Sequence, residues 1–332
     1  MPSANLDDLD RKIIHALYVD GRMPFSRLAK ALGCSEQTVA RRYQRLRDDN
    51  VVRVVGQLDS QRLGRSDWAV RIRCAPDAAT PVAEALAKRP DTSWVQLMSG
   101  GTEIFCAVRS SQDHSRVSLL LEQLPASRRI VDLEAHWLLR VFTFGSSFPG
   151  TLHLSDEEVS RLRAGRSEAD PVTTDNGTEG PAPKEDLQPS DWPLIQILAE
   201  DGRYTFRQIA GRIHWHESTV ARRIEQLSSS GVLYFDLDVA PEALGLGARA
   251  VLWMAVAPAH LMAVGQQLAE YREVPFAAAT TGSTNLMASL SCSDDYALFE
   301  FMTKEIASFE GVTRVETSPV IRSVKMHATL VV

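Results

Sequence analysis

The chain has 332 residues, enough for about two domains of ordinary size. Hydrophobic residues make up 44% and charged residues 23%, which indicates a globular protein with a sizeable core and excludes a wholly disordered chain. The net charge of -6 argues against a uniformly basic surface for nucleic acid, but leaves room for a local basic element. The longest apolar stretch, 250–259, is shorter than the roughly 20 residues of a membrane helix, and residues 6–8 are not basic. We therefore expect a cytoplasmic protein with no membrane partner.

The sequence offers little for catalysis or metal binding. Its four cysteines lie far apart with no CxxC pattern, so neither a disulfide framework nor a zinc site is indicated. A P-loop, GxSxG and HExxH are all missing, and the eight histidines have no obvious cysteine or carboxylate partner. We expect no catalytic residues, no metal and no cofactor, and hence a protein that is not an enzyme.

An internal repeat organises the chain. A shift of 181 residues places Gly21-Arg22 on Gly202-Arg203 and residues 38–42 on 219–223, and a shift of 182 places Gly100 on Gly282. Between the copies, residues 166–186 have the composition of a flexible linker. The predicted boundaries are 1–64 and 187–246 for two winged helix-turn-helix modules, 65–150 and 247–332 for two α+β domains, and 151–186 for a short helix and the linker.

Residues 6–50 carry apolar side chains at helical spacing, which predicts three helices. The helices are separated at 20–21 and at 33–35, where Gly33 suits a helix exit and Ser35 caps the next helix with Glu36 in its first turn. Residues 51–58 then form a strand or wing. This order predicts a winged helix-turn-helix.

From Trp68 the period changes to two, with Trp68, Val70, Ile72 and Cys74 on one face of a half-buried strand. The predicted elements that follow are a helix at 77–88, strands at 93–98 and 104–108, a helix at 113–124 and a strand at 130–144. This βαββαβ order is ferredoxin-like, and the second copy repeats it over 248–324, with a further strand expected at 326–332. Before the linker, the capping-box spacing of residues 155–158 predicts one short helix.

The third helix has the chemistry of a DNA reader. Its apolar positions Val39, Tyr43 and Leu46 leave the polar side chains facing out, where Arg can contact guanine or phosphate and Gln can contact adenine. Arg42 lies nearer the buried edge and is either a DNA contact or a structural ion-pair residue. The predicted DNA-binding residues are Gln37, Thr38, Arg41, Arg42 and Arg45, with Ser218, Thr219, Arg222 and Arg223 in the second copy.

The second module is expected to bind DNA less strongly. Residues 6–64 hold eleven basic and eight acidic residues, a net +3, whereas residues 187–245 hold five and eight, a net -3. His214 and His216 replace Gly33 and Ser35, and His is a poor residue for a turn that needs positive φ and for a helix cap. A turn of altered shape is therefore expected, and the module is either a second DNA contact or a packing partner.

Two turns of the α+β domains have small residues that let a ligand approach the backbone, together with threonine hydroxyls that can bond polar atoms. Glu103 could hold an ammonium group, whereas Asn285 could bond a ligand without demanding charge. An ordinary tight β-turn explains the same composition, so both interpretations stay open. The candidate residues are Gly100, Gly101, Thr102 and Glu103, and Gly282, Ser283, Thr284 and Asn285.

Over nearly the whole chain apart from the linker, the sequence resembles the Lrp/AsnC (feast/famine) family of transcription regulators. The resemblance rests on Leu9-Asp10, Asp20-Gly21-Arg22, Leu28-Ala29, Gly33-x-Ser35, Thr38-Val39-x-x-Arg42 and Leu63-Gly64, and on their repetition. It implies a transcription regulator that binds specific duplex DNA, forms homo-oligomers through its sheets, and responds to an amino acid or related metabolite near the two turns. The usual family chain holds one copy, so this tandem chain can mimic a dimer.

Two other functions are alternatives to DNA-binding regulation. Siroheme decarboxylases resemble the same family and are sometimes fused in tandem, but they carry a His-Asn-Tyr segment where this chain has Gln96-Leu97-Met98 and Ala278-Ala279-Thr280. The enzyme interpretation therefore loses its key histidine. An assembly or corepressor subunit that does not bind DNA itself is the third alternative.

Overall fold

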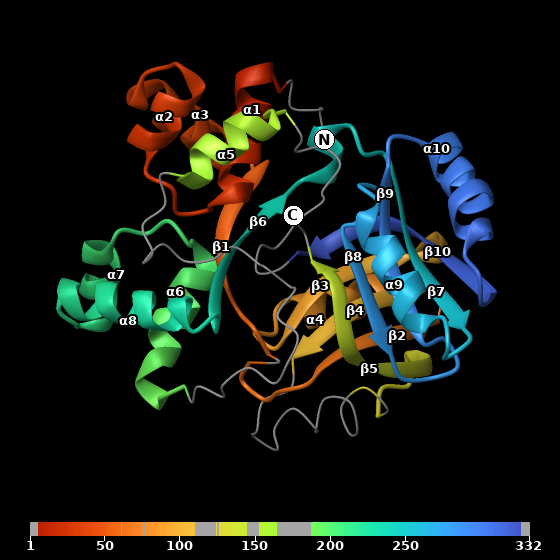
Figure 1. Ribbon diagram of the computed structural model, residues 1–332. Coiled ribbons are helices and arrows are strands. Elements are labelled where there is room, and N and C mark those ends of the chain that lie inside the picture. Colours follow the sequence, from red (N-terminus) through yellow and green to blue (C-terminus); the bar gives the residue numbers. More distant parts are fainter. Residues whose placement is uncertain are drawn as a thin grey trace. The chain divides into compact units, whose positions relative to one another are not determined.

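The computed structural model describes residues 6–60, 62–75, 77–109, 124, 126–144, 153–164 and 187–326. The chain divides into two compact units, one containing residues 1–64 and 150–245 and the other 65–149 and 246–332 (Figure 1). Each unit therefore takes one part from each half of the chain. The predicted linker lies outside the described residues, as do the predicted helix at 113–124 and strand at 326–332 apart from Leu124 and Met326.

The first helix-turn-helix module has the three predicted helices, α1 (Asp8–Val19), α2 (Phe25–Leu32) and α3 (Glu36–Asp48). Gly33 ends α2 in the left-handed conformation, with φ of 65°. The Ser35 hydroxyl caps α3 by accepting a hydrogen bond from the Thr38 amide at 3.1 Å. Ile13, Leu28 and Val39 are fully buried between the helices, so the apolar spacing identified the core correctly.

The second module repeats this arrangement with α6 (Trp192–Glu200), α7 (Phe206–Ile213) and α8 (Glu217–Ser229). The expectation of an altered turn is wrong, because His214 has φ of 56° and ψ of 36°, close to the 65° and 32° of Gly33. The weak cap is confirmed, since the His216 side chain makes no hydrogen bond to the start of α8. The second copy has kept the shape of the turn with a residue that fits it poorly.

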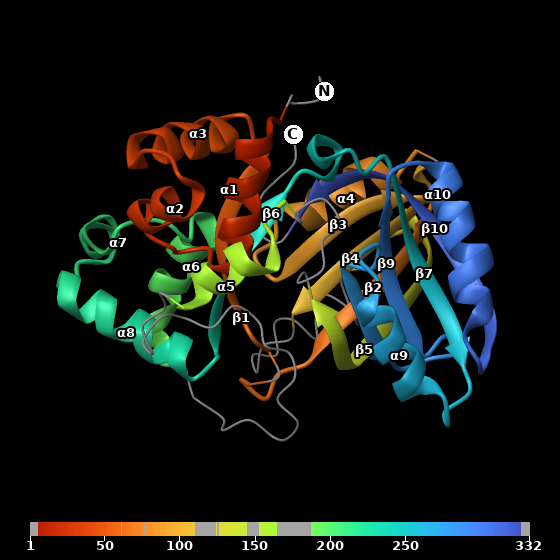
Figure 2. The same cartoon turned by 45° about the horizontal axis from the view of Figure 1, so that its top comes forward.

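Each module contributes one strand, β1 (Val52–Leu58) or β6 (Leu233–Val239), and the two strands pair antiparallel. The expected wing is therefore a ribbon shared between the modules (Figure 2). Val55 pairs with Asp236, its own counterpart in the repeat, so the register is two-fold symmetric about this pair. A symmetric register is what an isologous dimer contact would have, here built within one chain.

A short helix, α5 (Asp156–Ala164), begins with the predicted capping box between Ser155 and Glu158. It packs on α1 and α2 through the buried Leu162. The His15 Nδ1 atom accepts hydrogen bonds from the backbone amides of His153 and Leu154 at 3.1 and 3.0 Å. This segment therefore belongs to the first module's core.

The other unit contains the two α+β copies. The first has β2 (Asp67–Cys74), α4 (Ala79–Ala87), β3 (Thr92–Met98), β4 (Glu103–Arg109) and β5 (Ile130–Phe144). The second has β7 (Ala248–Val256), α9 (Leu261–Glu270), β8 (Phe276–Thr280), β9 (Leu286–Cys292), α10 (Asp295–Glu300) and β10 (Val312–Lys325). The strand orders β3-β4-β2-β5 and β8-β9-β7-β10 correspond, which confirms the ferredoxin-like prediction.

The two sheets join edge to edge at β5–β8 and β3–β10, which closes a ring of eight strands. The pairs Leu138↔Thr280 and Val320↔Met98 are equivalent in the repeat, so the two joins share one geometry. The two α+β copies therefore pair with each other within one chain, as two subunits of a dimer would.

This pairing corrects one prediction. The strand expected to be half-buried, β2, is buried on both faces: Val70 and Ile72 lie in one core, and Ala69 and Arg71 on the other face are 1% and 6% exposed. Ala69 belongs to a second core with Trp253 and Met287 from the other copy. The alternation of polar and apolar residues predicted a solvent-facing side of β2, but Arg71 on that side is buried in ion pairs.

Candidate DNA-binding and effector sites

The outer face of α3 carries side chains that the sequence analysis predicts to contact DNA. Gln37 and Arg41 are exposed and Thr38 is half-buried. The structure gives Arg41 no hydrogen bond or ion pair with any residue that it describes, so its guanidinium is available to a ligand. Arg45 is half-exposed, but its Nη2 atom pairs with the Asp10 carboxylate.

Arg42 forms ion pairs within the first module. Its Nη1 atom lies 2.6 Å from Asp7 Oδ2 and 2.9 Å from Asp10 Oδ1, and the Asp10 side chain is only 1% exposed. The hydrogen bond from Arg42 lowers the pKa of Asp7. Because a buried carboxylate needs a cation beside it, Arg42 is held at the N-terminal end of α1 by these two carboxylates. The structure thus favours the ion-pair interpretation that the sequence had left open.

The second recognition helix, α8, repeats this division of labour. Ser218 and Arg222 are exposed, Thr219 is half-buried, and Arg222 has no partner among the described residues. Arg223 donates from Nε and Nη2 to the buried Asp191 at 2.9 and 2.6 Å, as Arg42 does in the first copy. The positions of Arg45 and Arg47 are taken by Gln226 and Ser228, so α8 carries fewer positive charges.

Reciprocal arginines hold the two modules together. Arg22 donates to the carbonyls of Gly202 and Tyr204 at 2.8 and 3.2 Å, and Arg203 donates to those of Gly21 and Met23 at 2.6 and 3.0 Å. Each guanidinium also lies over an aromatic ring of the other module, Arg22 over Phe206 at 5.1 Å and Arg203 over Phe25 at 4.2 Å.

Burial first, and then the charge of Arg203, lower the pKa of Arg22 to about 10. The sequence repeat had marked this Gly-Arg pair without assigning it a role. Its repetition in both copies was the signal for a symmetric contact.

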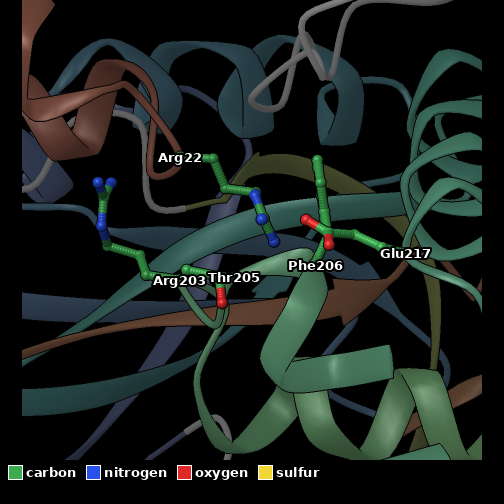
Figure 3. A pocket seen from close by; sticks show the side chains of 5 residues that line it. All are labelled: Arg22, Arg203, Thr205, Phe206 and Glu217. Atoms are coloured by element: carbon green, nitrogen blue, oxygen red, sulfur yellow. The ribbon is translucent and has the colours of Figure 1, made fainter. Parts of the chain in front are cut away.

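A cavity of about 280 Å³ lies beside this contact, lined by Arg22, Arg203, Thr205, Phe206 and Glu217. Figure 3 shows the Arg22 guanidinium and the Glu217 carboxylate reaching toward one another beside Phe206, while the Arg203 guanidinium points away. Glu217 lies in the first turn of α8, whereas the predicted DNA contacts Ser218 and Arg222 do not line this cavity. The cavity therefore belongs to the contact between the modules.

The first candidate effector turn begins with the short helix Ser99–Gly101 and needs its glycines, because Gly100 and Gly101 have φ of 74° and 83°. The Thr102 hydroxyl is turned back to donate to the Ser99 carbonyl at 3.1 Å. Glu103 is 4% exposed and accepts a hydrogen bond from the Ser99 hydroxyl at 2.9 Å. The side chains of this turn are largely satisfied from within the chain.

Arg71 completes that network. Its guanidinium pairs with Glu103 and with Glu316 of the second copy, and lies 3.4 Å from the Ser318 hydroxyl. Burial alone would lower the pKa of Arg71, but the hydrogen bonds to the two carboxylates outweigh it and raise the pKa. The idea that Glu103 holds a ligand's ammonium group therefore needs correction, because the chain's own cation occupies that carboxylate.

The second candidate turn keeps a glycine with positive φ and a threonine, but its other contacts differ. Gly282 has φ of 110°, and a side chain there would meet the His136 ring at 2.6 Å. Ser283 is exposed and Thr284 is buried. The Asn285 amide bonds both backbone groups of Val256 at 2.8 Å, so it holds β7 instead of facing a ligand.

Trp253 occupies the position of Arg71, and its ring lies 5.2 Å from that of His136. The His136 Nδ1 atom donates to the Thr281 carbonyl at 2.7 Å. Two buried nitrogen atoms here, His136 Nε2 and Trp253 Nε1, have no hydrogen-bond partner among the residues that the structure describes. The Glu134 carboxylate lies 3.7 Å from His136 Nε2, beyond hydrogen-bonding distance. These two nitrogen atoms beside the second turn can therefore still form hydrogen bonds. In the first copy, Arg71 and its two carboxylates already bond one another.

Within the described ranges, no three His, Cys, Asp or Glu side chains are grouped so that they could hold a metal ion. Of the helices that the structure describes, none has the length and apolar composition to cross a membrane.

Comparison with known proteins identifies both kinds of module. The AsnC-type helix-turn-helix domain matches residues 6–47 and 190–228, and the Lrp/AsnC ligand binding domain matches residues 249–330. The chain is 30% identical over 143 residues to an uncharacterised HTH-type transcriptional regulator of Pyrococcus horikoshii, a match that covers 43% of this chain and 90% of that protein. It is 31% identical over 137 residues to the HTH-type transcriptional regulator FL11 of Pyrococcus furiosus, covering 41% and 90%.

One solved structure, the siroheme decarboxylase NirDL, shares the fold of the tandem chain. Its TM-score is 0.62 at 15% identity, and the match covers 96% of this chain and 93% of that one. At this identity the likeness concerns the fold alone. The domain matches and the regulator relatives establish that the chain belongs to the Lrp/AsnC family of helix-turn-helix transcriptional regulators.

Proposed function

We propose that this regulator binds specific duplex DNA chiefly through α3, and that a small metabolite bound at the second regulatory turn changes its affinity for DNA. The observation that carries the DNA part is the outer face of α3, where Arg41 is exposed and unpaired beside the exposed Gln37. A helix whose other face is packed by Val39, Tyr43 and Leu46 can enter a major groove without unfolding its core.

The test is a titration of the full chain with a duplex found by genomic footprinting, at two salt concentrations. Arg41→Ala should weaken binding by about 1 to 3 kcal/mol if Arg41 contacts a base, and should reduce the salt slope if it contacts a phosphate. Arg161→Ala is the matched control, since Arg161 is exposed on α5 and pairs only with Glu157 among the described residues. Wild-type affinity in Arg41→Ala would contradict the assignment.

For the effector, the second turn is the better candidate because Arg71 fills the first. Gly282 and Ser283 are exposed there, and the Nε2 atom of His136 and the Nε1 atom of Trp253 have no hydrogen-bond partner among the described residues. The family resemblance favours an amino acid or a related small metabolite as the ligand. Coupling between this site and DNA is typically about 1 to 3 kcal/mol and must be reciprocal.

Calorimetry against a panel of amino acids is the direct experiment, with one ligand expected per chain. Thr284→Val should reduce ligand affinity, whereas Thr102→Val at the first turn serves as the matched control and should not. Binding of two ligands per chain would show that the first turn is a site as well. Equal losses of ligand affinity in both variants would show that the second turn is not the sole site.

A decarboxylase activity is not proposed. The shared fold supports it only at the level of architecture, and Gln96 and Ala278 stand where the resemblance would require a histidine. A corepressor role would follow instead if the full chain bound no duplex in the titration.

A further inference from the structure

The two helix-turn-helix modules are related by a local two-fold axis, because every residue pair in the register of the β1–β6 ribbon has its mirror. Val52 pairs with Val239 and Leu58 with Leu233, and these pairs exchange under the repeat. The arginine contacts of Arg22 and Arg203 are reciprocal in the same way. Figures 1 and 2 both show α2–α3 and α7–α8 on the same side of this ribbon.

A two-fold pair of recognition helices fits two half-sites in inverted orientation, about one helical turn of DNA apart or a multiple of it. In a homodimer the two helices are identical, so neither end of the DNA is distinguished. Here they differ: α3 carries Gln37 and the half-exposed Arg45 where α8 carries Ser218 and Gln226. Arg47 does not contribute to this difference, because it pairs with Asp201 of the second module at 2.9 Å. One chain therefore presents two-fold geometry with unequal chemistry.

We infer that one chain binds duplex DNA as an oriented pair of unequal readers, with a non-palindromic operator that specifies one half-site strongly and fixes which end of the site the first module occupies. This inference rests on the proposed DNA binding and adds to it the polarity of the partner. The second half-site is expected to tolerate most sequences, because α8 exposes one arginine, Arg222, together with the acidic Glu217 and Glu225.

Directed cleavage of DNA tests the orientation. Cys34 lies in the turn before α3 and is partly exposed, while Cys74, Cys106 and Cys292 are buried, so an iron–EDTA reagent can be attached to the native chain at Cys34. For the second module, Cys34→Ser is combined with Gly211→Cys, an exposed position on α7 where a side chain meets nothing within 4 Å. Lys30→Cys in the same background is its counterpart on α2.

We expect reagents at Cys34 and Lys30→Cys to cut one end of the footprint and the reagent at Gly211→Cys to cut the other. The preferred end should exceed the other by about ten-fold, the discrimination given by one good base contact. Equal cutting of both ends by each reagent would overturn the inference while leaving DNA binding intact. The lack of any footprint would remove the proposed function itself.

Discussion

The two helix-turn-helix modules have the same backbone and different surfaces. His214 adopts the left-handed conformation of Gly33, and Arg223 holds Asp191 as Arg42 holds Asp10. Around these shared supports, the net charge changes from +3 over 6–64 to -3 over 187–245. The pair has thus kept its two-fold geometry, while the positive charge is concentrated in the first module.

The regulatory halves diverge in the same manner. Arg71 in the first copy and Trp253 in the second occupy equivalent positions on paired sheets. Arg71 places its positive charge between two carboxylates, whereas Trp253 places its indole ring beside His136. Substitutions at such equivalent residues measure how much the two copies now differ in stability and in binding.

The largest effect is expected from Arg71→Met, which leaves Glu103 buried without its cation. Breaking a buried ion pair in this way should lower the free energy of unfolding by about 3 to 5 kcal/mol at pH 7, measured by urea denaturation. Arg73→Met is the control, because Arg73 is half-exposed and lies 3.7 Å from the same Glu316.

This loss should also depend on pH. The hydrogen bond from Arg71 lowers the pKa of Glu316 from an unfolded value near 4.5. That contribution to stability is fully present above pH 4.5 and disappears as the pH falls through the lower folded pKa. The gap between wild type and Arg71→Met should therefore narrow in acid, and a gap that widens there would refute the ion-pair explanation.

A smaller difference is expected between the structural arginines of the two modules. Arg223→Ala removes the bidentate partner of Asp191, whereas after Arg42→Ala the buried Asp10 still has Arg45. We expect a loss of about 3 kcal/mol for the first and about 1 kcal/mol for the second. Equal losses in thermal or urea unfolding would show that Arg45 does not compensate.

The smallest effect concerns the helix caps. His216→Ser gives α8 the hydroxyl cap that Ser35 gives α3, and should stabilise the chain by about 1 kcal/mol. Ser35→His is the reciprocal variant and should destabilise it by a similar amount. If neither variant moves the unfolding midpoint, the two caps are equivalent and the comparison fails at this position.

Local features of the fold could be read from the sequence because they depend on neighbouring residues. The spacing of Val39, Tyr43 and Leu46 located the buried face of α3, and Gly33 and Ser35 located its start. Partners distant in sequence could not be read in this way. The pairing of β1 with β6, the burial of Arg71 by the second sheet, and the use of Asn285 to hold Val256 all depend on contacts between the copies or between strands.

The candidate sites show the same limit. Outward-facing positions such as Arg41 and Arg222 follow from helical periodicity alone. Whether Arg42 contacts DNA or Asp10 depends on how α1 packs against α3, and periodicity contains no information on that.

A side-by-side titration of Arg41→Ala and Arg222→Ala on one duplex measures the inequality of the two recognition helices most directly. Both arginines are exposed, unpaired among the described residues and equivalent in the repeat, so the variants differ only in their module. If the first module is the stronger reader, Arg41→Ala loses about 1 to 3 kcal/mol of binding free energy and Arg222→Ala clearly less. An equal or greater loss from Arg222→Ala would contradict it.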